Sequence, residues 1–134
     1  MTTSTSSTQD GVVLFAHGSR DPLWSKPMEA VAARIAADRP TLAVACAYLE
    51  LSEPDLPTTV AHLASTGITR ITIVPMFLGT GRHARDDLPM LVSALRAEYP
   101  GVQFHVQQAI GEDERMTSLM AEIASTPFAP FASA

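Results

Sequence analysis

A chain of 134 residues is long enough for one compact domain and too short for separate cofactor and substrate domains. Its residues are 46% hydrophobic and 17% charged, a composition that can bury a core and is not typical of a disordered protein. The formal net charge is −5, and the nine basic residues form no dense cluster. This balance argues against a basic face for nucleic acid or for an anionic membrane surface, so we expect neither partner.

The single cysteine, Cys46, lies in an apolar run and has no partner for an intrachain disulfide. The sequence therefore offers no disulfide scaffold, no CxxC redox pair and no cysteine-based zinc or iron–sulfur site. Residues 2–9 are polar and uncharged, so we expect 1–10 to form a flexible leader rather than a secretion signal. Because no segment approaches the roughly 20 apolar residues of a membrane span, we expect a cytoplasmic protein.

Two strands and two helices are predicted in the first half of the chain. Residues 12–16 are continuously apolar, which is typical of a strand buried on both faces. Apolar residues then recur at helical spacing and predict a helix over about 25–38. A second strand is expected over about 42–49. Residues 53–55 then open a second helix, which Gly67 is placed to end in the left-handed conformation.

The third strand and the third helix are expected on either side of a glycine-containing loop at 79–83. The run 71–74 predicts a strand, and its pairing should weaken near Pro75 because proline cannot donate to a central ladder. Apolar residues at helical spacing after the loop predict a third helix, with Pro89 in its first turn. The aspartates at 86–87 would then lie at its amino end, where the helix dipole favours them.

The last strand and helix complete the pattern. Residues 102–107 alternate between apolar and polar side chains, which is typical of a half-exposed edge strand. A fourth helix is predicted from four apolar residues at helical spacing, Met116, Leu119, Met120 and Ile123. Residues 125–134 contain two prolines and small residues, so we expect a loose tail. A single domain is therefore expected over residues 11–124.

Four strands alternate with four helices, and this alternation predicts an α/β protein with a parallel sheet and right-handed crossovers. We expect a three-layer sandwich whose four strands follow the flavodoxin-like order 2-1-3-4. In that order the topological switch point lies between the first and third strands. Ligands of open parallel sheets bind beyond the carboxyl ends of the strands at such a point.

Three predicted loops meet at this edge of the sheet, and they hold most of the polar chemistry of the chain. The first loop carries His17, Ser19 and Arg20, the second carries Glu50, and the third carries Arg82, His83 and Arg85. Two histidines would thus flank the switch point with a carboxylate nearby. Such a grouping raises the prospect of a functional site well above that of a single loop histidine.

Simpler interpretations of the same residues stay open. His62 lies on the second predicted helix and His105 on the outward side of the edge strand, so both are expected to be plain surface residues. Glu50 could merely cap the helix that follows it. The three arginines could pair with their acidic neighbours, which are Asp21, Asp86 and Asp87.

Several enzyme classes fit these loops poorly. Residues 79–84 match the spacing G-x-G-x-x-A, but the dinucleotide motif belongs to the first strand–helix turn, not the third. The segment 16–18 is similar to the R-H-G motif of phosphohistidine phosphatases and mutases, with alanine in place of the phosphate-binding arginine. Neither a G-x-S-x-G nucleophile elbow nor a Walker sequence occurs.

Three motifs together resemble the small class II tetrapyrrole chelatases, of the sirohydrochlorin cobalt or iron chelatase type. The first is His-Gly-Ser-Arg at 17–20, and the second is Leu49-Glu50 followed by Pro54. The third runs from Pro-Met-Phe-Leu at 75–78 through Gly-Arg-His to Asp-Leu-Pro at 87–89. The motifs occur in the order and spacing of the family, and the resemblance covers about residues 11–124.

This resemblance implies a chelatase-like fold and a lyase that inserts Co²⁺, Fe²⁺ or Ni²⁺ into sirohydrochlorin or a related tetrapyrrole, in cobalamin or siroheme biosynthesis. The metal ion would be a substrate, with no permanent cofactor. Imidazole binds all of these ions, and two histidines leave open positions through which the ion can pass to the ring, so His17 and His83 are the candidate metal ligands. Glu50 would act with them as proton acceptor or electrostatic helper.

A tetrapyrrole with many carboxylates would also explain the arginines at the crevice of an acidic protein. Ser19, Arg20, Arg82 and Arg85 are therefore the candidate substrate-binding residues. We further expect a homodimer, because longer family members look like two such lobes fused in one chain. A noncatalytic carrier of metal or tetrapyrrole on the same fold is the alternative function.

Overall fold

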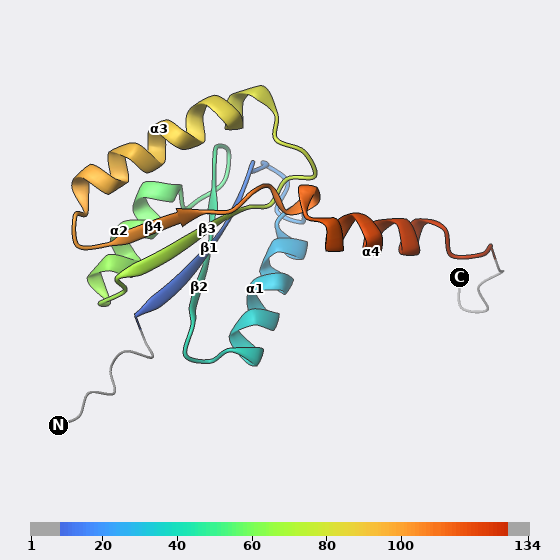
Figure 1. Ribbon diagram of the computed structural model, residues 1–134, viewed down its shortest axis with the longest axis horizontal. Coiled ribbons are helices and arrows are strands. Elements are labelled where there is room, and N and C mark those ends of the chain that lie inside the picture. The colour runs from blue at the N-terminus through green and yellow to red at the C-terminus, as the bar shows by residue number, and fades with distance from the viewer. Residues whose placement is uncertain (1–8, 129–134) are drawn as a thin grey trace.

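The computed structural model of the chain describes residues 9–128, except for the side chain of His83. Within these residues one parallel sheet has the strand order β2-β1-β3-β4 (Figure 1). The elements are, in chain order, β1 (Asp10–Ala16), α1 (Lys26–Asp38), β2 (Ala43–Tyr48), α2 (Leu56–Ser65), β3 (Arg70–Pro75), α3 (Arg82–Glu98), β4 (Gln103–Val106), the short 3₁₀ helix η2 (Ile110–Glu112) and α4 (Glu114–Ala124). The predicted α/β class and the order 2-1-3-4 are confirmed.

The carboxyl ends of β1, β2 and β3 lie level with one another. Ala16 at the end of β1 pairs with Tyr48 at the end of β2, and Phe15 pairs with Pro75 at the end of β3. The amide of Met76 then donates to the carbonyl of Phe15 at 2.7 Å, after which the ladder stops. The segments that follow β1, β2 and β3 therefore leave the sheet side by side. The pairing between β1 and β3 ends next to Pro75, where the sequence predicts that it weakens.

The two faces of the sheet are covered unequally. One face packs against α2 and α3 in a core that includes Phe15, Ile71, Ile73, Val60 and Val92. The other face packs against α1 alone, mainly through Leu14, Val74 and Met28. Burying each such large side chain contributes about 1.5–3 kcal/mol. Most of the stability therefore resides on the α2–α3 side of the sheet.

The second helix forms where the sequence predicts it. The Asp55 carboxylate caps its amino end by accepting a 2.9 Å hydrogen bond from the amide of Thr58. At the other end Gly67 has φ +93°, so the predicted left-handed glycine is confirmed. β4 lies at the edge of the sheet beside β3, which confirms the predicted edge strand.

The third helix begins earlier than predicted. α3 starts at Arg82, so Pro89 is its eighth residue and not part of its first turn. An interior proline removes one helical hydrogen bond and costs about 3 kcal/mol. Buried residues Ala84 and Leu88 lie on the same face of the helix and pack in the core, and this packing offsets the cost. The prediction failed because tertiary packing outweighed a local rule.

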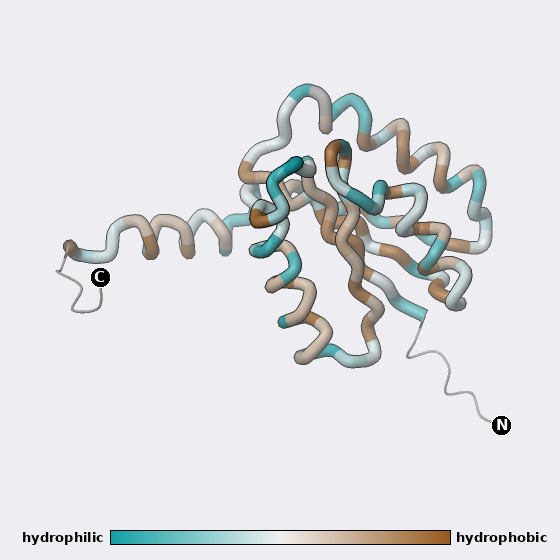
Figure 2. The backbone as a smooth tube through the Cα atoms, turned by 180° about the vertical axis from the view of Figure 1, so that it is seen from behind, coloured by the Kyte–Doolittle hydropathy of each residue, from teal (hydrophilic) through white to brown (hydrophobic). Residues whose placement is uncertain are grey.

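The fourth helix is formed but covers neither face of the sheet. α4 projects from the body of the molecule past α1 (Figures 1 and 2), and none of its residues is buried. Asp113 caps its amino end, and hydrogen bonds from Arg115 lower the pKa of that carboxyl to about 2. The helix is therefore locally capped, and of its predicted apolar residues Met116 and Met120 are half-buried while Leu119 and Ile123 are exposed.

The predicted boundaries are met only in part. The expected flexible leader extends to residue 10, but Asp10 already belongs to β1 and its carboxylate pairs with Arg70 at 2.6 Å. Residues 1–8 of that leader and 129–134 of the expected tail lie outside the described residues. No helix in the described part is long and apolar enough to cross a membrane.

Candidate active site

His17 follows β1 at the carboxyl edge of the sheet, where the strand order reverses. Its ring lies against the ring of Phe77, with centroids 4.3 Å apart and planes inclined by 34°. Phe77 is buried in the α2–α3 core, whereas His17 is exposed. One side of the imidazole is therefore fixed against the core, and its nitrogens remain accessible to solvent.

The loops after β1 and β2 are hydrogen-bonded to each other beyond the end of the sheet. The amide of Glu50 donates to the carbonyl of His17 at 2.9 Å, which extends the ladder by one step. The Ser52 hydroxyl then donates to the carbonyl of Ser19 at 2.8 Å and accepts from the Ser19 amide at 2.9 Å. These bonds hold the backbones of His17 and Glu50 in a fixed relation.

This close approach of the two loops depends on Gly18. Gly18 has φ +104°, and a Cβ at this position would overlap the carbonyl oxygen of Glu50. On the opposite loop Leu51 also has a positive φ, of 66°, which is uncommon for a residue with a side chain. The backbone at the site is thus held in conformations that isolated loops rarely adopt.

A cavity of about 270 Å³ opens between these loops and α3. It is lined by four residues, His17, Leu49, Glu50 and Asp87. The structure therefore brings together two of the three residues predicted to be catalytic, His17 and Glu50. The third, His83, lies in the first turn of α3, one turn before Asp87, and not in the loop where the sequence placed it.

Asp87 is the cavity residue that the sequence did not single out. It was expected to stabilise the amino end of a helix, but it is the sixth residue of α3, beyond the first turn. Its spacing of four residues after His83, inside the Gly-x-His-x-x-x-Asp motif, is the signal that could have identified it.

The candidate substrate-binding residues surround this edge and are not paired with the neighbouring aspartates. Arg20, Arg82 and Arg85 are exposed, and Arg85 donates only to the carbonyl of Thr80, at 3.4 Å. Among the described side chains the ion pairs are Asp10–Arg70 and Asp113–Arg115. The alternative in which the three arginines pair with Asp21, Asp86 and Asp87 is therefore wrong.

Ser19 and Asp21 shape the first loop instead. The Ser19 hydroxyl accepts a 3.0 Å hydrogen bond from the Asp21 amide, and the Asp21 carboxylate accepts one of 2.9 Å from the Leu23 amide. Both side chains thus stabilise turns that lead from β1 into α1. Ser19 lies in a loop of the site, but its hydroxyl is hydrogen-bonded within that loop.

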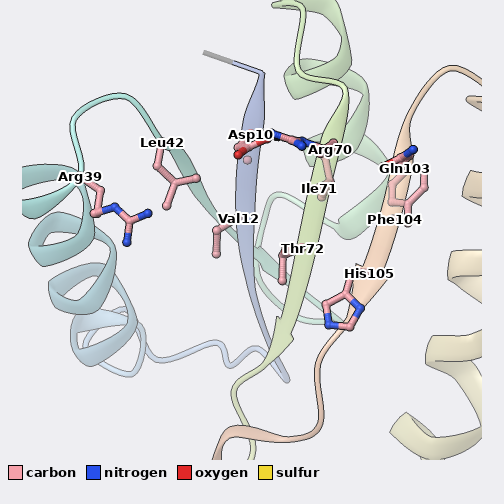
Figure 3. A pocket seen from close by; sticks show the side chains of 11 residues that line it. Asp10, Val12, Arg39, Leu42, Arg70, Ile71, Thr72, Gln103, Phe104 and His105 are labelled. Atoms are coloured by element: carbon pink, nitrogen blue, oxygen red, sulfur yellow. Dashed lines mark hydrogen bonds and ion pairs between the residues drawn. The ribbon is translucent and has the colours of Figure 1, made fainter. Parts of the chain in front are cut away.

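Three simpler interpretations can now be decided. Glu50 does not cap α2, because Asp55 occupies that position. His62 is exposed in the last turn of α2, as predicted. His105 is also exposed and lies next to Thr72 in a separate groove, which Asp10 and Arg70 line farther along the strands (Figure 3). Neither of these histidines lines the cavity that holds His17, Glu50 and Asp87.

The described side chains form no group of three or more histidine, cysteine, aspartate or glutamate residues close enough to enclose a metal ion. Structural metal sites have a closed set of four ligands, whereas a site that passes a metal ion on needs open positions. The exposed imidazole of His17 can bind a divalent ion briefly, and the carboxylates of Glu50 and Asp87, which line the same cavity, can accept protons.

Comparison with known proteins identifies the family. The CbiX family model matches residues 11–126. The chain belongs to the CbiX family. The predicted resemblance to class II tetrapyrrole chelatases is confirmed, and this CbiX protein is a metal chelatase.

The relatives of this chain differ in length and in the metal that their names give. The sirohydrochlorin cobaltochelatase of Methanosarcina acetivorans is 30% identical over 117 residues, which cover 82% of this chain and 90% of that protein. The sirohydrochlorin ferrochelatase of Priestia megaterium is 29% identical over 113 residues, which are 84% of this chain but only 42% of the relative. The CbiX protein of Marinobacter aquaeolei VT8 has the same fold, with a TM-score of 0.75, 34% identity and coverage of 86% and 93%.

Proposed function

We propose that this protein inserts a divalent metal ion, Co²⁺, Fe²⁺ or Ni²⁺, into sirohydrochlorin or a closely related tetrapyrrole. The observation that carries the proposal is the cavity at the switch point of a CbiX-family sheet, where His17 lies beside the carboxylates of Glu50 and Asp87. Relatives named as cobaltochelatase and ferrochelatase support sirohydrochlorin as the substrate. They leave the choice of metal open.

Each residue has a role that follows from its chemistry. His17 and His83 bind the incoming ion through imidazole nitrogens and leave its other positions open for the ring nitrogens. When the ion enters, two pyrrole N–H bonds break, their electron pairs form bonds to the metal, and two protons leave. Glu50 accepts a proton or offsets the changing charge, because its carboxylate lines the same cavity as His17.

The substrate carries carboxylate groups around its ring, and the exposed arginines of this edge are suited to bind them. Arg20, Arg82 and Arg85 have no acidic partner among the described side chains, so their guanidinium groups are available. Ser19 contributes to binding through the loop that it stabilises. The acidic net charge of the chain does not prevent this local recognition.

The decisive experiment is anaerobic incubation of the purified protein with sirohydrochlorin and Co²⁺, Fe²⁺ or Ni²⁺. The optical spectrum should change to that of the metallated ring faster than in a control without protein. A spectrum of bound but unmetallated substrate, with no rate above the control, would support the carrier instead. Roles in cobalamin or siroheme biosynthesis and a cytoplasmic location stay predictions.

Replacement of Glu50 by glutamine should lower kcat for metal insertion and leave the KM for sirohydrochlorin nearly unchanged. The carboxylate acts as protons leave, so its contribution arises in the transition state and not in substrate binding. Steady-state kinetics with the metal held in excess measure both constants. An unchanged kcat with a raised KM would show that Glu50 binds substrate and that the proton acceptor lies elsewhere.

We also propose that the protein acts as a homodimer in which α4 of one copy packs on the other. Leu119 and Ile123 of α4 are 46% and 64% exposed, which leaves an apolar stripe without a partner. A groove of about 420 Å³ lies on the sheet face beside α1 and includes Val12, Thr72 and His105 (Figure 3). In a three-layer sandwich this face would be covered by a second helix.

A second copy is the occupant that fits this groove. The 11 residues of α4 span about 16 Å, close to the roughly 20 Å length of the strands beneath the groove. Arg39 lines the groove without an acidic partner among the described side chains, whereas Arg70 is paired with Asp10 there, and Glu114 and Glu122 on α4 provide charge opposite to that of Arg39. Exchange of helices would also bring two lobes together, as the greater length of the ferrochelatase relative suggests.

Two other apolar segments, residues 75–78 and Trp24, are weaker candidates for the dimer interface. Phe77, from the segment 75–78, is a core residue with 4% exposure, so it is not a candidate for the interface. Leu78 is 72% exposed and Trp24 is 38% exposed, with its ring 6.1 Å from that of Tyr48. The stripe on α4 is the better candidate, because both of its residues lie on one helix that has no buried residue and covers neither face of the sheet (Figure 1).

Light scattering should therefore give twice the mass of a single chain for the wild type at micromolar concentration. Leu119→Asp places a charge in the apolar stripe and should shift the protein to the mass of one chain, with α4 still helical by circular dichroism. Val31→Asp is the matched control, since Val31 is an exposed apolar residue in the middle of α1. A wild type that has the mass of one chain and still inserts metal would contradict the dimer.

A further inference from the structure

Asp87 connects the candidate site to a second hollow along α3. It lines the cavity with His17 and Glu50, and it also lines an adjoining hollow of about 410 Å³ whose other residues are Leu49, Met90, Leu91 and Ala94. Apart from Asp87 these residues are apolar, so the hollow can accept the flat face of an apolar ring. Asp87 lies where the polar cavity and the apolar hollow meet.

No partner among the described side chains accounts for this carboxylate. Asp87 lies beyond the first turn of α3, so it neither caps the helix nor interacts strongly with its dipole. It forms no ion pair with any of the lysine or arginine side chains, all of which lie in the described part of the chain. Its neighbour Asp86 is equally exposed but lines neither the cavity nor the hollow.

We propose that Asp87 is a further catalytic residue of metal insertion, a carboxylate that accepts one of the two protons released by the macrocycle while Glu50 accepts the other. The inference rests on the proposed function and deepens it. A divalent ion replaces two pyrrole protons, so two protons have to be accepted, and the reaction involves no change of oxidation state. Each proton passes from a pyrrole nitrogen to a carboxylate oxygen and then to water.

The positions of Glu50 and Asp87 allow each carboxylate to accept one of the two protons. Glu50 comes from the loop after β2 and Asp87 from α3, and the two residues reach the same cavity from different elements. His17 lies in that cavity as well, so an ion held by its imidazole would have one acceptor from the loop after β2 and another from α3. A single carboxylate would have to lose its first proton to water before it could accept the second.

The test compares Asp87→Asn with its matched control Asp86→Asn in the full-length protein. Asp87→Asn should lower kcat for cobalt insertion into sirohydrochlorin by about a hundredfold, the lower end of the usual range for a general base. Binding of metal-free sirohydrochlorin, followed by its absorption spectrum, should change by less than about twofold. Asp86→Asn should leave both quantities at wild-type values, and Asp87→Glu should recover part of the rate.

The outcomes separate this role from the function itself. A wild type that inserts metal, with Asp87→Asn equal to Asp86→Asn, overturns the role of Asp87 and leaves the proposed function intact. Weaker sirohydrochlorin binding at unchanged kcat also overturns it, because Asp87 would then position substrate. A wild type that inserts no metal overturns the proposed function and this inference together. Thermal unfolding of each variant shows whether a lost rate reflects a lost fold.

Discussion

Replacing His17 by alanine should lower the rate of metal insertion by more than about tenfold at low metal concentration while leaving the fold intact. Groups that merely orient a metal ligand are worth about 10- to 100-fold in affinity or activity, so a ligand itself should be worth at least as much. The His17 ring is exposed and rests on Phe77 from outside the core, so its loss creates no buried cavity. His83→Ala should have a comparable effect.

Two other histidines provide controls for this experiment. His62 and His105 are exposed and do not line the cavity, so replacement of His62 by alanine should leave the insertion rate unchanged. Because His105 lines the groove proposed to hold α4 of the second copy, His105→Ala is compared only where light scattering shows that the variant keeps the wild-type mass. Initial rates at several cobalt concentrations distinguish weaker metal binding from slower insertion. Wild-type rates in both His17→Ala and His83→Ala, with cobalt kept limiting, would overturn the assignment of these residues as metal ligands.

The strands could be predicted because each is short, carries a continuous or alternating apolar pattern, and is followed by proline, glycine or polar residues. The buried run of β1 and the alternation in β4 distinguish a central strand from an edge strand, and the structure agrees with both. Strict alternation of strands and helices then leaves few compact topologies, which is why the order β2-β1-β3-β4 was predictable. The start of α3 was missed because core packing by Ala84 outweighs the local signal of Pro89.

The sequence predicts which loops form the site but not how those loops are folded. His17 and Glu50 follow strands that end level with each other, so their proximity follows from the topology. The hydrogen bonds between Ser19 and Ser52 were not predictable, because they depend on loop conformations that leave no periodic pattern. The direction of α4 was not predictable for a similar reason, since its apolar spacing is the same whether the helix packs on its own sheet or on another chain.

The second large effect is expected at Gly18, which touches no substrate in the proposed mechanism. Gly18→Ala should reduce metal insertion at least as strongly as His17→Ala and should also lower the melting temperature. A left-handed conformation costs a residue with a Cβ roughly 1–2 kcal/mol. At this position the Cβ would also overlap the carbonyl oxygen of Glu50, so the chain must move to accommodate it.

That movement has to separate the two loops, because Glu50 cannot yield alone. Its amide is hydrogen-bonded to the His17 carbonyl, and the Ser52 hydroxyl binds the Ser19 backbone on the far side of Gly18. Activity and stability should therefore fall together in Gly18→Ala, whereas His17→Ala should lose activity alone. Gly79→Ala is the matched control, since a Cβ there meets nothing within 4 Å, and it should be nearly silent. If Gly18→Ala keeps the wild-type melting temperature and insertion rate, the hydrogen-bonded contact between the loops is not what positions His17 and Glu50.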